Sequence, residues 1–174
     1  GLFIAMLFIY GKLNRSWRGQ REIKVVFTSI ANVRPDAPVL YNGLEVGRIL
    51  ETQIVPVDEA LLERLPALTE RNLENLPLSE EEREELRGVS SADLDAAIRK
   101  RIAGRTMAML SLNVLDEGDS KRYRLDDDIR ITSRILGETA VEIISGNGER
   151  LPAQDPPVLI GASHGAGNYA MSCR

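Results

Sequence analysis

The sequence is poor in the residues on which many active sites and metal centres depend. Among 174 residues it has one histidine, His164, and one cysteine, Cys173. A single cysteine excludes an internal disulfide and a cysteine-based zinc site, and a single histidine excludes a two-histidine metal site. Aromatic residues make up only 5% of the chain, so any hydrophobic core must be largely aliphatic.

An excess of positive charge is also missing. The chain has 22 Lys and Arg against 26 Asp and Glu, which gives a formal net charge of −4. Nucleic-acid binding depends on clustered cations that neutralise phosphates, so this composition argues against a nucleic-acid partner. The length fits one domain of ordinary size with short appendages.

Two short motifs resemble reactive sites but lack the context that the chemistry requires. Residues 161–165 match the G-x-S-x-G nucleophile elbow, yet only nine residues follow Gly165 and none of them is Asp or His, whereas the elbow needs both further along the chain. Asp126, Asp127 and Asp128 lack the spacing and the final Glu of a calcium-binding loop, and we interpret them as solvated turn residues. We therefore predict a protein that is not an enzyme, with no catalytic residue, metal site or cofactor.

The N-terminal residues combine an apolar run with a basic flank. Residues 1–11 carry no charge, and five cations follow between Lys12 and Lys24. As a helix, this run would reach only about 16 Å, against roughly 30 Å for the hydrocarbon core of a bilayer. We predict that residues 1–20 are part of a longer membrane anchor with its flank; the alternatives are a buried helix or the apolar part of a signal peptide, although no small-x-small cleavage site follows. The residues predicted to anchor the chain are Leu2, Phe3, Ile4, Leu7, Phe8, Ile9 and Trp17.

Hydrophobic residues that alternate with a period of two predict strands on both sides of a central segment. The predicted strands are about 23–28, 39–41, 46–55, 106–115, 123–125, 129–132 and 140–144. The first three should form an antiparallel meander, with Asn42 and Gly43 in a type I′ turn because both tolerate positive φ. The fold class is therefore all-β, a small seven-stranded barrel or sandwich.

The central residues 56–104 break this pattern and predict a helical insertion. Ser79 and Glu82 have the spacing of a capping box, and Leu94, Ile98 and Ile102 recur every four residues along one face. We interpret the insertion as a solvated excursion whose narrow apolar stripe could pack on a sheet edge or on a neighbouring subunit. Residues 162–174 form a glycine-rich tail that we predict to be disordered.

Two blocks of this sequence carry short motifs in a fixed order. In the first block, residues 37–39 match a G-A-P-V type turn in which Asp36 replaces the glycine, and Gly43, Val46 and Gly47 match a G-x-x-V-G-x-V hairpin. In the second block, Ile135, Leu136 and Gly137 match an L-L-G loop between the closing strands. In this order and spacing, the two blocks resemble the MCE (mammalian cell entry), or MlaD-like, domain family. Residues 157–161 are similar to the exit segment of that family.

The resemblance implies a seven-stranded β-domain at residues 21–161 that assembles into a homohexameric ring. Ile135 and Leu136 would then line an apolar pore and contact lipid, while Gly43, Gly47 and Gly137 shape the turns. An apolar pair in a strand-to-strand loop needs a partner, which a ring centre or an acyl chain would supply; the alternative is that the pair folds back as core.

The resemblance also implies a role and a location. Proteins of this family serve as the substrate-binding component of ABC-type phospholipid transport systems, with permease and ATPase subunits as partners. The domain would lie in the periplasm, held by a single-pass anchor in the bacterial inner membrane, whereas the positive-inside rule taken alone would place the basic flank in the cytoplasm. The alternative function is a structural envelope adaptor that does not conduct lipid.

Overall fold

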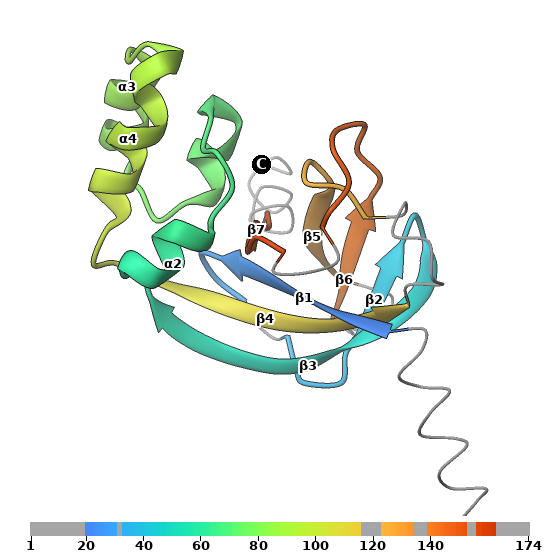
Figure 1. Cartoon of the computed structure of the whole chain (residues 1–174). Coiled ribbons are helices and arrows are strands. Elements are labelled where there is room, and N and C mark those ends of the chain that lie inside the picture. Colours follow the sequence, from blue (N-terminus) through green and yellow to red (C-terminus); the bar gives the residue numbers. More distant parts are fainter. Residues whose placement is uncertain (1–19, 31–32, 116–122, 134–138, 153–155, 163–174) are drawn as a thin grey trace, which may run out of the picture.

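Seven strands form one strongly curved sheet in the order β5-β6-β2-β3-β4-β1-β7 (Figure 1). The computed structural model describes residues 20–30, 33–115, 123–133, 139–152 and 156–162. The strands are β1 (Gln20–Phe27), β2 (Pro38–Tyr41), β3 (Leu44–Pro56), β4 (Thr106–Leu115), β5 (Asp128–Ser133), β6 (Thr139–Ile144) and β7 (Leu159–Ile160).

The two edges of this sheet meet, so the sheet is a nearly closed barrel, as the sequence predicts. Ala162, just after β7, forms a parallel bridge with Arg130 of β5, and its N–H donates to the Ile129 carbonyl at 2.7 Å. Closure in this way removes edges that would otherwise pair with other chains. Ala162, which the sequence assigns to the disordered tail, is therefore part of the barrel.

The predicted meander of the first three strands is wrong in one respect. Strands β2, β3 and β4 are antiparallel neighbours, but β1 pairs with β4 and not with β2. β2 instead pairs in parallel with β6, and β1 in parallel with β7. Alternation along a strand shows which side chains share a face but carries no information about the neighbouring strand.

The seven strands are not the seven predicted ones. Residues 123–125 form no strand and contribute only one bridge, between Arg124 and Arg150. Tyr123 and Leu125 are apolar because they pack against the core and not because they belong to a strand. The Tyr123 ring packs edge-on against Tyr41, with ring centroids 5.6 Å apart. The seventh strand is instead β7, from the brief apolar segment near the C-terminal end of the domain.

Two glycines of the first motif block have the geometry that the motif demands. Asn42 and Gly43 have φ angles of 50° and 89°, which confirms the type I′ turn between β2 and β3. At Gly47, an added Cβ would lie 1.9 Å from the Asn113 carbonyl oxygen. Gly47 therefore allows the backbones of β3 and β4 to approach closely.

Strand β4 separates two hydrophobic cores. Leu110, Leu112 and Val114 face the barrel interior, whereas Met107 and Met109 face the opposite side. Side chains alternate across a strand, so both predicted faces of this strand are covered. The second core is formed with the insertion.

The insertion is a packed layer and not a solvated excursion. It contains α2 (Glu59–Arg64), the 3₁₀ helix η1 (Glu70–Asn75), α3 (Glu80–Arg87) and α4 (Ser91–Ile102). The predicted stripe of Leu94, Ile98 and Ile102 is buried within this chain, so it does not face a neighbouring subunit. Its partners come from the other helices of the insertion and from the outer face of the sheet.

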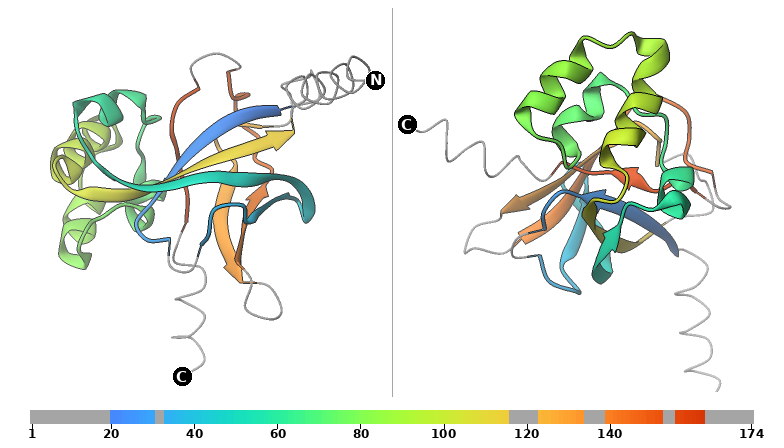
Figure 2. Two further views of the ribbon diagram at one scale, coloured as in Figure 1. Left: turned by 90° about the horizontal axis from the view of Figure 1, so that it is seen from below. Right: turned by 90° about the vertical axis from the view of Figure 1, so that its left-hand side faces the viewer.

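The insertion and the start of β1 lie at opposite ends of the barrel (Figure 2). Among the described residues, no helix combines the length and apolar character that crossing a bilayer requires. The predicted anchor residues all lie outside the described residues: Leu2, Phe3, Ile4, Leu7, Phe8, Ile9 and Trp17. Arg21 and Lys24, counted above with the basic flank, belong to β1.

Candidate functional site

The predicted pore loop connects two strands of the barrel, but Ile135, Leu136 and Gly137 themselves lie outside the described residues. β5 and β6 pair antiparallel over six residue pairs, from Asp128–Ile144 to Ser133–Thr139. Their inward side chains, which include those of Ile129, Val141 and Ile143, belong to the barrel core. The loop therefore joins the ends of a regular hairpin with a well-packed base.

Acidic residues before β5 fix the neighbouring loop. The Asp126 carboxylate accepts hydrogen bonds from the backbone N–H groups of Asn147 at 2.9 Å and Gly148 at 2.7 Å. Asp127 accepts from the N–H of Gly146 at 2.8 Å and is 6% exposed. The interpretation of these residues as solvated turn residues is therefore wrong for Asp127.

The two carboxylates have opposite pKa shifts with separate causes. The N–H groups of Asn147 and Gly148 lower the pKa of Asp126, because they stabilise its charged form. Burial raises the pKa of Asp127. Backbone N–H groups donate hydrogen bonds to both carboxylates, so Asp126 and Asp127 hold residues 146–148 in place.

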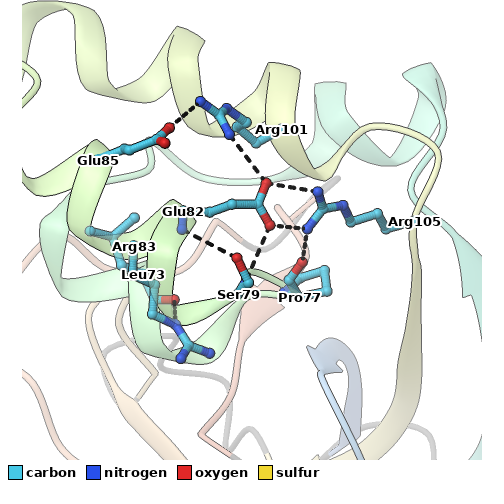
Figure 3. A network of polar contacts seen from close by, with 8 residues as sticks. All are labelled: Leu73, Pro77, Ser79, Glu82, Arg83, Glu85, Arg101 and Arg105. Atoms are coloured by element: carbon cyan, nitrogen blue, oxygen red, sulfur yellow. Dashed lines mark hydrogen bonds and ion pairs between the residues drawn. The ribbon is translucent and has the colours of Figure 1, made fainter.

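A polar network ties α3 to Arg101 of α4 and to Arg105, which lies between α4 and β4 (Figure 3). Arg105 donates to both carboxylate oxygens of Glu82, each at 2.8 Å. Glu82 also accepts from the Ser79 N–H at 3.1 Å, and the Ser79 hydroxyl accepts from the Glu82 N–H at 3.2 Å, which confirms the capping box. Arg101 lies 3.4 Å from Glu82 and 2.6 Å from Glu85.

This network stabilises the insertion through a charged carboxylate that accepts several hydrogen bonds. The hydrogen bond from Arg105 lowers the pKa of Glu82 to about 2. Glu82 is therefore ionised at neutral pH and has no proton to donate. Within the part of the chain that the structure describes, no three His, Cys, Asp or Glu residues are grouped to hold a metal ion.

One surface depression lies within the insertion, and another lies where the insertion meets the sheet. The larger, of about 700 Å³, lies between α3 and α4 and is lined by charged residues that include Lys100 and Arg101. The smaller, of about 260 Å³, lies where α2 covers the outer face of the sheet, with Met109 in its lining. Neither depression could be predicted from a local pattern, because the larger depends on how two helices pack and the smaller joins residues as far apart as Lys24 and Val158.

Exposed apolar residues occur at the barrel end where β1 begins. Leu44, Leu115 and Ile144 are 71%, 37% and 39% exposed. Leu115 pairs with Gln20, the first residue of β1. The N–H of Asn42 donates to the Ile143 carbonyl, which places the end of β6 beside the turn that leads to Leu44.

No protein-family model matches this chain, and no curated protein matches it. Among solved structures, it is similar to a chain of the Acinetobacter MlaFEDB complex in an ATP-bound conformation. The two chains share 10% sequence identity with a TM-score of 0.41, and the match covers 93% of this chain and 88% of the other. A likeness of this degree assigns neither a family nor a function.

Proposed function

We propose that this protein is the membrane-anchored, non-enzymatic ring component of an ABC-type phospholipid transport system. Copies of the β-domain surround an apolar pore lined by Ile135 and Leu136. An anchor in the bacterial inner membrane holds the domain in the periplasm, where it meets the permease and its ATPase. The expected ring is a homohexamer.

The pairing of β2 with β6 carries this proposal. The first motif block supplies β2 and the second supplies β6, and the two pair in parallel through Val39 and Val141. Blocks about a hundred residues apart in the sequence thus form neighbouring strands of one barrel, while the insertion leaves the barrel on its outer side. This is the behaviour expected if both blocks belong to a single domain with an added layer.

The backbone at Asp36 gives a second line of support. Asp36 stands where the family pattern has glycine, and its φ angle is 73°. Only glycine adopts this region without cost, although Asp and Asn tolerate it better than other residues do. The position therefore has the geometry that explains a glycine in the pattern.

The exposed residues Leu44, Leu115 and Ile144 support membrane anchoring. They lie at the barrel end from which the chain continues back toward the apolar run of residues 1–11. Apolar side chains at this end suit contact with a membrane surface or with the permease.

Photo-cross-linking in cells tests the pore. A photoreactive amino acid at position 135 or 136 should give lipid adducts, whereas the same residue at the exposed Glu81 of α3 should give none. Replacement of Ile135 by Asn should weaken lipid labelling from position 136 while folding is retained. Equal labelling at Glu81 would contradict the pore and favour the structural adaptor.

A further inference from the structure

We propose that the smaller depression, between α2 and the sheet, binds a single-chain anionic amphiphile, such as a fatty-acid carboxylate or a monoalkyl phosphate. It has a volume of about 260 Å³. This site is separate from the proposed pore, because the residues that line the depression all lie outside the β5–β6 hairpin and the loop of that hairpin. The site is formed by α2, the outer face of the sheet and the segment before β7.

The floor of the depression is apolar. Leu61, Met109 and Val158 line it and are 7%, 8% and 1% exposed. An apolar cavity of about 150 Å³ stays dry and holds a benzene molecule. A depression of this volume therefore has room for part of an alkyl chain, and burial there would remove apolar surface from water.

The rim of the depression is cationic. Lys24 and Arg64 line it together with one carboxylate, Asp58. That carboxylate is already engaged, because Asp58 caps α2 by accepting a hydrogen bond from the Leu61 N–H at 2.9 Å. Asp58 keeps its negative charge, but the two cations outnumber it, so the rim has a net positive charge.

Lys24 is the cation best placed to hold an anionic head group. It is half-buried on β1, opposite Ser111 of β4, on the sheet face that the insertion covers. Its ammonium has no hydrogen bond or ion pair with any residue that the structure describes. The Arg64 guanidinium donates a long hydrogen bond to the Pro156 carbonyl, at 3.4 Å, so it can turn toward the same anion.

An apolar floor beside two available cations matches a ligand that is apolar at one end and anionic at the other. A neutral alcohol would leave the cations without a partner, and a cationic amphiphile would be repelled. A carboxylate and a phosphate would each accept charge-assisted hydrogen bonds from Lys24 and Arg64. The recognised chemistry is thus an anionic head on one alkyl chain.

Photoaffinity labelling of the full chain in lipid nanodiscs tests this site. The probes are dodecanoic acid with a diazirine on the carbon five positions from its carboxylate, the corresponding dodecyl phosphate and the corresponding dodecyltrimethylammonium. We expect adducts at Leu61, Met109 or Val158 from an anionic probe, and about tenfold fewer from the cationic probe. Labelling by both anions identifies a general anion site, and labelling by the phosphate alone identifies a phosphate head group.

Variants separate this site from the pore. Ala60→Trp, at an exposed residue of α2 that lines the depression, should fill it and abolish the adducts. Lys24→Gln should reduce them about tenfold, whereas Lys100→Gln, in the other depression, is the charge-matched control and should change nothing. Ile135→Asn should also leave the adducts unchanged, so a failure of the pore and a failure of this site are distinguishable. Undiminished labelling of Ala60→Trp, equal labelling by the cationic probe, or loss of adducts in Ile135→Asn would each overturn the proposal.

Discussion

Arg105 and Glu82 form a two-point ion pair, in which both terminal guanidinium nitrogens lie 2.8 Å from the carboxylate oxygens. The pair joins the first turn of α3 to the residue that follows the end of α4 and Gly104. Arg105 also donates to the Pro77 carbonyl at 2.6 Å. One side chain therefore fixes three parts of the insertion relative to one another.

The first prediction concerns the pH dependence of this ion pair. The pKa of Glu82 is lowered from 4.5 to about 2 in the folded protein, so the folded state binds its proton less readily than the unfolded state does. The stabilisation is present above the unfolded pKa and is lost as the pH falls from 4.5 to about 2. Urea unfolding across this range should show a smaller loss of stability in Glu82→Gln than in the unchanged protein. Parallel pH profiles for the two proteins would contradict the assignment.

The second prediction concerns the close approach at Gly47. Gly47→Ala places a Cβ 1.9 Å from the Asn113 carbonyl oxygen, and neither backbone can move without breaking the β3–β4 ladder. We expect a loss of about 3 kcal/mol or more in the free energy of unfolding. Gly88→Ala is the matched control, since its Cβ would come no closer than 3.5 Å to the Glu85 carbonyl oxygen. Its stability should change by less than about 0.5 kcal/mol, and equal effects of the two variants would refute the close approach.

The third prediction concerns the coupling of the insertion to the barrel. Ile98 is fully buried in the second core, and Ile98→Ala should cost about 2–5 kcal/mol. Because Val26, Met107 and Met109 of the sheet belong to the same core, amide protection in β1 and β4 should fall as well. Hydrogen exchange measures this directly, with Leu50→Ala at an exposed position of β3 as the control. Unchanged protection in β1 and β4 would show that the insertion folds as a separate unit.

The fourth prediction concerns the N-terminal run. β1 begins at Gln20, so removal of residues 1–19 deletes no described strand. We expect the shortened protein to keep its strand content by circular dichroism and to remain in solution without detergent. Sedimentation checks this outcome, and aggregation of the shortened protein would indicate that the apolar run packs against the barrel.

Local features of the fold could be predicted from the sequence. The Asn42–Gly43 turn and the capping box at Ser79 and Glu82 depend on residues within four positions of one another, and both are confirmed. Side-chain chemistry and backbone conformation determine each other at this range. The approximate limits of β3 and β4 follow from the same kind of local pattern.

Long-range relationships could not be predicted in this way. The pairing of β1 with β4 and the contact of Ala162 with β5 depend on how the chain closes in space. Leu73 and Leu76 are buried, although the charged residues around them favour a solvated segment. The depression at Lys24 combines three strands, a helix and the segment before β7, and nothing local to Lys24 indicates it.

The insertion leaves and rejoins the barrel at one point. The Gly104 N–H donates to the Val57 carbonyl at 2.8 Å, and the Val57 N–H donates to the Arg105 carbonyl at 2.7 Å. The chain thus leaves and re-enters the barrel at neighbouring residues. The entropic cost of closing a loop there rises only slowly with the length of the loop. The barrel can therefore accept a different module at this junction, such as a reporter domain or a partner-specific cap, without a change in strand register. The replacement must still bring an apolar face of its own, because Met107 and Met109 would otherwise be left in water.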